Sequence, residues 1–264
     1  MKFFIIFLSG IFCFGSGLFA PIEVPEFDKE KAELGKKIYF ETKFNENKLS
    51  CDSCHNIYLN QSGSSQKYNT PTILNSALST IFSQNRTIRN LNQKIKRSFL
   101  NKFELASRED IVVSAVRLNS TYVAEFNALY KSGVTFDNIV DALENFVKTL
   151  VTPDSKFDKF LKGEIALNAD EEEGFSFFLD LGCVSCHNGV NLGSNNFQKS
   201  VNSNAMVKVP TLRNITKTSP YAGNSKNLNG AILNMSLAKI IILLSDFVVV
   251  KFIKFLETLN GELP

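Results

Sequence analysis

The sequence predicts a mainly α-helical protein built from two similar halves that are joined by long loops. One segment, 135–153, places its apolar residues at helical spacing. Few segments alternate in the manner of strands, and none forms a run of hairpins. A C-x-x-C-H-N motif followed by P-T-x-x-N occurs twice, over 51–75 and over 183–214. This repetition indicates an internal duplication.

Two helices are expected in the middle of the chain. Residues 107–118 (SREDIVVSAVRL) begin with a capping-box pattern from Ser107 to Asp110. Residues 135–153 (TFDNIVDALENFVKTLVTP) form a second helix that Pro153 ends. Its predicted buried face consists of Ile139, Val140, Leu143, Phe146, Val147 and Leu150.

Two further helices are expected nearer the C-terminus. Residues 168–182 (NADEEEGFSFFLDLG) begin with an asparagine cap, carry acidic residues in the first turn and end at Gly182. Their predicted buried residues are Phe175, Phe178 and Leu179. Residues 240–256 (IIILLSDFVVVKFIKFL) contain too many charges for a membrane span and instead predict a buried helix. Its inward residues are expected to be Phe252, Phe255, Leu256 and Leu259.

Composition and the N-terminus restrict the class of protein. A chain of 264 residues is long enough for one large or two small domains, and a net charge of +3 is too small for a nucleic-acid-binding surface. Residues 1–20 have a basic start, an apolar run and small residues before Ala20, which is typical of a signal peptide. An uncleaved anchor is the alternative, because Pro21 follows the expected cleavage point. Either interpretation predicts export to the periplasm.

The four cysteines outside this leader all belong to the repeated motif. A zinc ribbon would place its pairs about 15–20 residues apart, whereas these pairs lie far apart, and neither follows the strand expected of a thioredoxin-like redox site. Covalent haem attachment requires two thiols one helical turn apart and a histidine directly after them. The sequence therefore predicts two covalently bound haem c groups, held by Cys51, Cys54, His55, Cys183, Cys186 and His187.

Beyond these motifs, the chain resembles the bacterial di-haem cytochrome c peroxidases and the related methylamine-utilisation di-haem enzymes. The resemblance runs from about residue 30 to the end and rests on ELGKKIYFE, TPTILN, LVTPDSKFDKFLKG, VPTLRN and FLETLNGELP. It implies two cytochrome c-like haem domains: a peroxidatic one at 21–158 and an electron-accepting one at 159–264. It also implies a homodimer.

The resemblance implies that hydrogen peroxide is reduced to water with electrons from a reduced mono-haem cytochrome c or a similar small donor. Met235 matches the position of the family's axial methionine on the second haem iron, although Met235 and Met206 could both be core residues. Glu104 in NKFELA is similar to the family's catalytic glutamate. The alternative for Glu104 is a solvated helix residue.

Two further site assignments concern Arg213 and a calcium ion. Arg213 is expected to pair with a haem propionate or to lie on the surface. Asn69, Thr218 and Pro220 match the ligands of a calcium ion that the family holds between its domains.

The chain departs from the family around the peroxidatic site. The loop after the first motif lacks histidine, Ser83 stands where the family has tryptophan, and PYAGNS at 220–225 lacks another histidine. The first haem iron is then either open to peroxide or bound by Lys67 or Tyr68. The protein is accordingly a peroxidase that needs no reductive activation, or an electron-transfer cytochrome. A protein-modifying enzyme of the methylamine-utilisation type is a third possibility.

Overall fold

The computed structural model describes residues 17–57, 64–65, 68–83, 88–200, 204–221 and 225–263. Within these residues the protein is mainly helical, as predicted. The longer helices and the short 3-10 turns and strands are, in chain order, α1 (Lys29–Phe40), β1 (Ser64–Ser65), β2 (Tyr68–Asn69), η1 (Ser76–Leu78), α2 (Leu91–Leu100), α3 (Glu109–Arg117), α4 (Ser120–Leu129), α5 (Phe136–Thr149), α6 (Lys156–Leu161), α7 (Ala169–Asp180), η2 (Cys183–Ser185), β3 (Phe197–Lys199), β4 (Met206–Lys208), η3 (Ile215–Lys217), α8 (Leu228–Lys239) and α9 (Asp246–Glu257).

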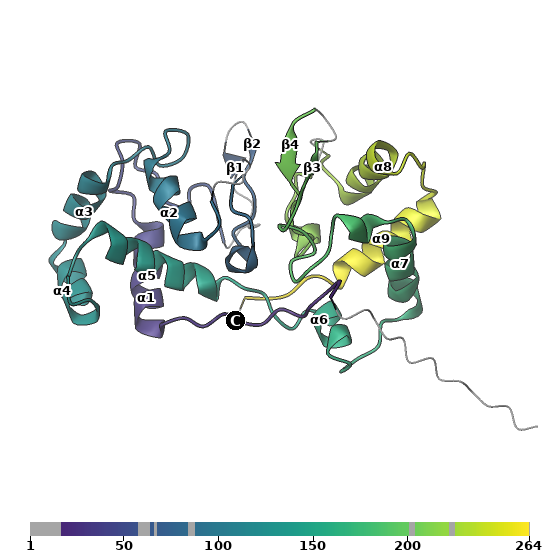
Figure 1. The fold of residues 1–264 in the computed structure, drawn as a ribbon, viewed down its shortest axis with the longest axis horizontal. Helices are drawn as coiled ribbons and strands as arrows, with labels where there is room; N and C mark the ends of the chain where they lie inside the picture. Colours follow the sequence, from purple (N-terminus) through teal and green to yellow (C-terminus); the bar gives the residue numbers. More distant parts are fainter. Residues whose placement is uncertain are drawn as a thin grey trace, which may run out of the picture.

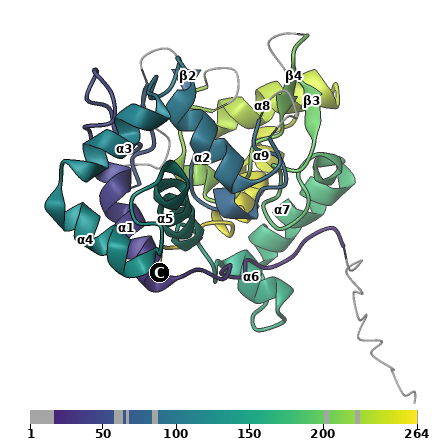
Figure 2. The same ribbon diagram turned by 60° about the vertical axis from the view of Figure 1, so that its left-hand side comes forward.

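The elements form two lobes with separate apolar cores. In Figure 1, α1 to α5 make one lobe, α6 to α9 make the other, and the two β-hairpins lie between them. The first core runs from Leu34 to Leu150 and the second from Phe157 to Leu259. Figure 2 shows α1 beside α5 in one lobe and α7 beside α9 in the other.

Each lobe is organised around one helix crossing that requires glycine. A Cβ added to Gly35 of α1 would lie 2.0 Å from the Ala142 carbonyl oxygen of α5. A Cβ added to Gly174 of α7 would lie 2.0 Å from the Lys251 carbonyl oxygen of α9. In both pairs, therefore, a glycine lets the two helices pack closely together. The helices that precede the two motifs, α1 and α7, have equivalent positions in their lobes.

The duplication extends through the loops that follow each motif. Antiparallel strands β1 and β2 follow the first motif, and β3 and β4 follow the second. Asn75 and Asn214, the last residues of the two P-T-x-x-N segments, both have a left-handed φ of 58° and both precede a 3-10 turn. Left-handed backbone is unusual outside glycine but is tolerated by asparagine.

The predicted helices agree with the structure apart from one cap, one side chain and the start of the last helix, since residues 241–245 are not helical and α9 begins at Asp246. The apolar residues expected to be buried in α5 and α9 are all buried. Asn168 caps α7 in a capping box with Glu171, and Gly182 ends the segment with a left-handed φ of 76°. Leu179 of α7 is only half-buried. No helix within the described ranges is long and apolar enough to cross a membrane.

The predicted capping box at Ser107 is wrong. Helix α3 begins after Arg108, whose side chain caps nothing. The buried Ser107 hydroxyl instead donates a hydrogen bond to the Phe44 carbonyl. A distant backbone acceptor therefore competes successfully with the local amides for this hydroxyl.

The two ends of the described chain cross over to the opposite lobes. Phe19 packs against the second core, and the chain then runs along one edge of the molecule to α1 (Figure 1). Leu263, after α9, packs against the first core. Each lobe therefore includes a short terminal segment from the far end of the chain.

Candidate haem sites and the surrounding charged residues

The first motif forms a tight turn next to α1. The amides of Cys54 and His55 both donate to the Cys51 carbonyl, with N···O distances of 3.2 and 2.9 Å. The Tyr39 hydroxyl donates to the His55 carbonyl. The Nδ1 atom of His55 lies 3.0 Å from the carbonyl oxygen of Pro71 in the P-T-x-x-N segment. This contact occupies one ring nitrogen and leaves Nε2 for an iron ion.

The second motif has the same geometry. The amides of Cys186 and His187 donate to the Cys183 carbonyl, with distances of 3.2 and 3.0 Å. The Nδ1 atom of His187 lies 3.1 Å from the Leu192 carbonyl oxygen. The two histidines are therefore both oriented by backbone carbonyls in the loop that follows them.

The four motif cysteines are free of disulfides and suit thioether formation. Burial raises the pKa of the Cys51 thiol to about 12 and that of Cys183 to about 11. Such surroundings disfavour a charged thiolate, whereas a thioether sulfur carries no charge.

The histidine environments also fit iron binding. Burial, reinforced by the Lys94 ammonium, lowers the pKa of His55 to about 4. Burial likewise lowers the pKa of His187. Both imidazoles are therefore neutral at physiological pH, and the neutral imidazole is the form that binds a metal.

An ion pair lies beside the first motif. Lys94 Nζ of α2 lies 3.1 Å from both carboxylate oxygens of Glu104, and the Asn101 side-chain amide donates to the same carboxylate at 2.9 Å. The Glu104 charge acts on Cys51, Cys54 and His55, whose pKa values it raises. Glu104 is therefore close enough to the first motif to affect all three of its functional side chains.

Among the residues that the structure describes, no carboxylate or ammonium group contributes to the pKa shifts of Cys183 and His187. Apart from burial and backbone hydrogen bonds, the pKa shifts of Cys183 and His187 have only the neighbouring Cys186 as a cause. The two motifs therefore share their geometry but differ in their electrostatic surroundings.

Glu104 itself is ionised at neutral pH. Burial acts to raise its pKa, but Lys94 and the hydrogen bonds from Ser98, Asn101 and Lys94 outweigh burial, so the pKa lies below its ordinary value. The interpretation of Glu104 as a freely solvated helix residue is wrong, because the residue follows α2 in a half-buried turn and is paired.

Both predicted alternatives for Arg213 are wrong. The Arg213 side chain is fully buried and forms an ion pair with the buried Asp158, with an NH1···Oδ1 distance of 2.9 Å. Its other donors reach the Ser155 hydroxyl and the carbonyls of Val190 and Ala20. Since Asp158 belongs to α6, Arg213 joins that helix to the second P-T-x-x-N segment and has no exposed surface.

The remaining predicted ligands stay predictions. Met235 is half-buried in α8, whereas Met206 in β4 is 48% exposed. Thr218 directly follows η3, and Asn69 is the last residue of β2. Pro220 follows a cis peptide bond. In the described part of the chain, no group of three or more His, Cys, Asp and Glu residues could hold a metal ion.

Some predicted positions cannot be compared with the structure. Lys67 and the Tyr68 side chain lie outside the described residues, as do residues 84–86 and 222–224. Ser83, which replaces the family's tryptophan, accepts a hydrogen bond from the Ile88 amide at 3.2 Å.

Two charged residues near the first motif were missed by sequence reasoning. Lys94 belongs to a lysine- and arginine-rich helix in which nothing in the sequence distinguishes it. Lys208 of β4 reaches across from the second lobe and donates to the Ile81 carbonyl at 3.2 Å. Burial lowers the pKa of Lys208 and the Lys94 charge lowers it further, so the two ammonium groups are near each other. Only the tertiary structure brings them together.

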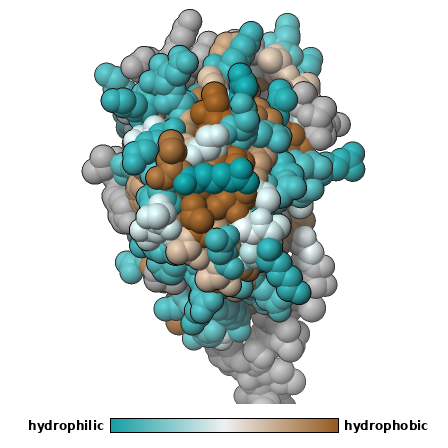
Figure 3. Space-filling view, turned by 90° about the vertical axis from the view of Figure 1, so that its left-hand side faces the viewer, coloured by the Kyte–Doolittle hydropathy of each residue, from teal (hydrophilic) through white to brown (hydrophobic). Residues whose placement is uncertain are grey.

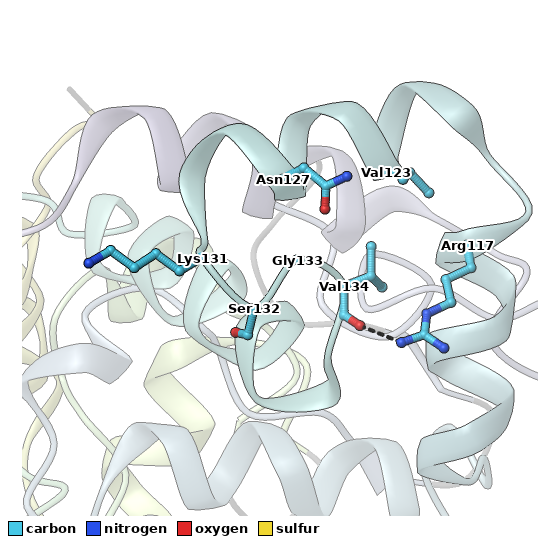
Figure 4. Close-up of a pocket in the computed structure, with 7 residues that line it drawn as sticks. All are labelled: Arg117, Val123, Asn127, Lys131, Ser132, Gly133 and Val134. Carbon is cyan, nitrogen blue, oxygen red and sulfur yellow. Dashed lines mark hydrogen bonds between the residues drawn. The ribbon is translucent and has the colours of Figure 1, made fainter.

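Two surface features of the first lobe lie apart from the motifs. A pocket between α3, α4 and the loop after α4 has no cysteine, histidine or carboxylate in its lining (Figure 4). Arg117 crosses one side of it to donate to the Val134 carbonyl at 2.9 Å. Figure 3, which faces the α3 and α4 end of the molecule, shows apolar side chains gathered at the centre of a hydrophilic surround. The lining of the pocket includes no predicted site residue.

The fold and the paired motifs define a class, the helical c-type cytochromes that carry two haem-attachment sequences in one chain. The family model described as di-haem cytochrome c peroxidase matches residues 29–166. The chain belongs to this family.

Several characterised proteins are similar to the chain. The cytochrome c551 peroxidase of Nitrosomonas europaea is 33% identical, over 89% of this chain and 81% of the relative. The cytochrome c551 peroxidase of Pseudomonas aeruginosa is 29% identical, over 94% of this chain and 86% of the relative. The methylamine utilization protein MauG of Methylorubrum extorquens is 27% identical, over 73% of this chain and 64% of the relative.

Solved structures share the fold at low sequence identity. A MauG-like protein associated with microbial copper homeostasis superposes with a TM-score of 0.79 at 19% identity, covering 93% of each chain. The diheme peroxidase BthA of Burkholderia thailandensis superposes with a TM-score of 0.72 at 13% identity, covering 92% of this chain and 90% of that one.

Proposed function

We propose that the protein is a periplasmic di-haem c-type cytochrome that reduces hydrogen peroxide to water with electrons from a reduced cytochrome c. Cys51 and Cys54 would hold the first haem and His55 would bind its iron. Cys183, Cys186 and His187 would do the same for the second haem, with Met235 as the opposite ligand. Each haem supplies one-electron redox chemistry, so two of them suit a two-electron reduction.

The observation that supports a peroxidatic role for the first lobe is the position of Glu104. Its charge acts on Cys51, Cys54 and His55, whereas no carboxylate among the described residues contributes to the pKa shifts of Cys183 and His187. A carboxylate beside only one motif favours a division of labour, with peroxide chemistry at the first lobe and electron entry at the second.

Glu104 would move a proton between the two peroxide oxygens. Reduction of one H2O2 to two H2O consumes two electrons and two protons. The ionised carboxylate would accept a proton from one oxygen and return it to the other, which then leaves as water. Lys94 would hold the carboxylate in place and keep it ionised until peroxide arrives.

The partner, the calcium site and the assembly belong to the same proposal. Relatives named cytochrome c551 peroxidase support a small c-type cytochrome as the electron donor. A calcium ion between the lobes would use Asn69, Thr218 and Pro220, since oxygen ligands suit calcium. The expected assembly is a homodimer.

An electron-transfer cytochrome without peroxidase activity is the second candidate. The observation that favours it is Ser83, which stands where the family has tryptophan and has no aromatic ring to place between the haems. The similarity to MauG proteins keeps a protein-modifying enzyme as a third candidate.

Stopped-flow mixing tests the peroxidase proposal. Fully oxidised and half-reduced holoprotein would each be mixed with peroxide in the presence of a reduced cytochrome c. Donor oxidation by the fully oxidised form is expected, because the loop that follows the first motif has no histidine to occupy its iron. Failure of both forms to oxidise the donor would eliminate the enzymatic proposal and leave the electron-transfer candidate.

A matched pair of variants tests the role of Glu104. Glu104→Gln should lower kcat/KM by about 10²–10⁴-fold, the usual contribution of a general acid or base. Glu109→Gln, in the exposed first turn of α3, should leave it unchanged. Equal effects of the two substitutions would show that Glu104 has no catalytic role.

A further inference from the structure

Residues 18–22, which we call the N-terminal strap, are docked on the second lobe. The Leu18 carbonyl accepts a hydrogen bond of 2.7 Å from the Gly189 amide, two residues after His187. The Ala20 carbonyl accepts one of 3.1 Å from Arg213 NH2. The Ile22 amide donates one of 3.0 Å to Asp158 Oδ1. The strap therefore contacts the second motif's loop and both members of the buried ion pair.

The Phe19 side chain adds apolar contacts to these hydrogen bonds. Its ring centroid lies 5.6 Å from that of Phe157, 5.7 Å from Phe175 and 6.4 Å from Phe178. These rings belong to α6 and α7 and form the centre of the second core. Phe19 is therefore part of the folded protein and not only the end of a leader.

Cleavage after Ala20 would remove two parts of this arrangement. The Phe19 ring would be lost from the aromatic cluster. The Ala20 carbonyl would also be lost, and Arg213, whose side chain is fully buried, would keep a donor without a protein acceptor. A buried donor left unsatisfied is costly.

The sequence offers an earlier cleavage point that keeps both contacts. Leader peptidases require small residues at the first and third positions before the cut bond. Gly17 and Gly15 satisfy this requirement for the Gly17–Leu18 bond. The apolar run that precedes them is long enough for a leader, and the residue after the cut is then Leu18 instead of Pro21.

We propose that export removes residues 1–17 by hydrolysis of the Gly17–Leu18 bond, and that residues 18–22 remain as a strap on the second lobe. Water is added across this amide, so that Gly17 gains a carboxylate and Leu18 gains a free amino group. The co-reactant is water, and the catalyst is a membrane-bound signal peptidase. The inference rests on the export that forms part of the proposed function, and it moves the leader boundary from Ala20 to Gly17.

N-terminal sequencing and intact-mass measurement of the exported holoprotein test the boundary. The full chain would be expressed with its own leader in a bacterium that attaches haem c. Leu18 is the expected first residue. A chain that begins at Pro21, or one that retains Gly17, would overturn the proposal. Peroxidase activity is read separately, so an active protein with the wrong terminus contradicts only this inference.

Two leucine substitutions provide the matched comparison. Gly17→Leu places a large residue at the proposed cut and should leave the precursor unprocessed. Ala20→Leu changes an exposed residue that lies after the proposed cleavage point. The precursor with this substitution should be processed like the natural sequence. The opposite pattern, with processing blocked by Ala20→Leu and not by Gly17→Leu, would place the cut after Ala20.

The strap itself is tested by its contribution to thermal stability. Phe19→Ala should lower the melting temperature of the exported holoprotein, because Phe19 contacts three core rings. Leu18→Ala, which shortens a side chain that is 46% exposed, should leave it unchanged. Equal melting temperatures for the natural protein and both variants would show that the strap does not dock.

Discussion

The side-chain amides of Asn75 and Asn214 both donate to the Thr152 hydroxyl oxygen, each at 2.9 Å. The two asparagines are the equivalent last residues of the duplicated P-T-x-x-N segments, and all three residues are buried. The backbone amide of Asn75 donates to the carbonyl of Leu150, just after α5. The backbone amide of Asn214 donates to the carbonyl of Leu259, just after α9. The equivalent asparagines of the two halves therefore share one threonine hydroxyl.

Replacing Thr152 should separate loss of the hydroxyl from loss of volume. Thr152→Val keeps the shape but leaves two buried amide donors without their acceptor, which should cost about 2–4 kcal/mol of unfolding free energy. Thr152→Ser keeps the oxygen and should cost less than about 1.5 kcal/mol. Denaturant unfolding of both variants measures the difference. Equal losses would show that the shared hydroxyl contributes no more than packing.

The two glycine crossings should resist any side chain. Gly35→Ala and Gly174→Ala each place a methyl group against backbone that cannot move independently of its helix, so each should cost about 1–3 kcal/mol or more. Gly230→Ala in α8 is the control, because its nearest neighbour is the Asn227 side chain at 3.2 Å. Thermal unfolding measures all three. A stability loss for Gly230→Ala as large as the other two would contradict the crossing argument.

The pairing of Lys94 with Glu104 predicts a pH effect. Because the Glu104 pKa is lowered in the folded protein, the pair stabilises the fold above the ordinary glutamate pKa and loses this effect as pH falls through the lowered value. Lys94→Met removes the positive charge that counteracts the effect of burial on Glu104, so the Glu104 pKa should rise. The acid limb of the kcat/KM profile should then move to higher pH.

Lys96 supplies the control for this experiment. It lies on the same helix as Lys94 but pairs with Asp137, at 2.6 Å, near the start of α5. Lys96→Met should leave the acid limb in place. If both substitutions shifted the limb equally, the effect would come from net charge and not from the Lys94–Glu104 contact.

The two described methionines can be distinguished by reduction potential. If Met235 binds the second iron, Met235→His replaces a thioether by a more basic imidazole and should lower one haem potential by more than about 0.1 V, within the roughly 0.8 V range set by axial ligands. Met206→Leu should leave both potentials unchanged. Spectroelectrochemical titration measures them. If Met206→Leu lowered a haem potential and Met235→His did not, Met206 would be the iron ligand and Met235 would not.

Much of the fold could be predicted because its signals are local. The apolar face of α5, the asparagine cap of α7 and the buried face of α9 each lie within one stretch of sequence, and the structure confirms them. The capping box at Ser107 failed because the Phe44 carbonyl, distant in sequence, takes the hydroxyl. A local pattern cannot include such a competitor.

The candidate site residues also divide into those with a local sequence signal and those without one. The C-x-x-C-H motifs are contiguous, so their cysteines and histidines were identified directly. Arg213 was misassigned because its partner, Asp158, lies 55 positions away, and a buried ion pair leaves no periodic signal in the sequence. Lys94 and Lys208 were missed for the same reason.

The sequence by itself determined the buried faces of α5 and α9, the duplicated motifs and the four cysteines and two histidines suited to hold haem, since each depends on neighbours within a few residues. Only the tertiary structure decided that Glu104 lies beside the first motif with Lys94, that Thr152 joins the two halves, and that Phe19 belongs to the second core. The physical reason is that burial and charge pairing act through space. Such interactions join residues that the sequence keeps far apart.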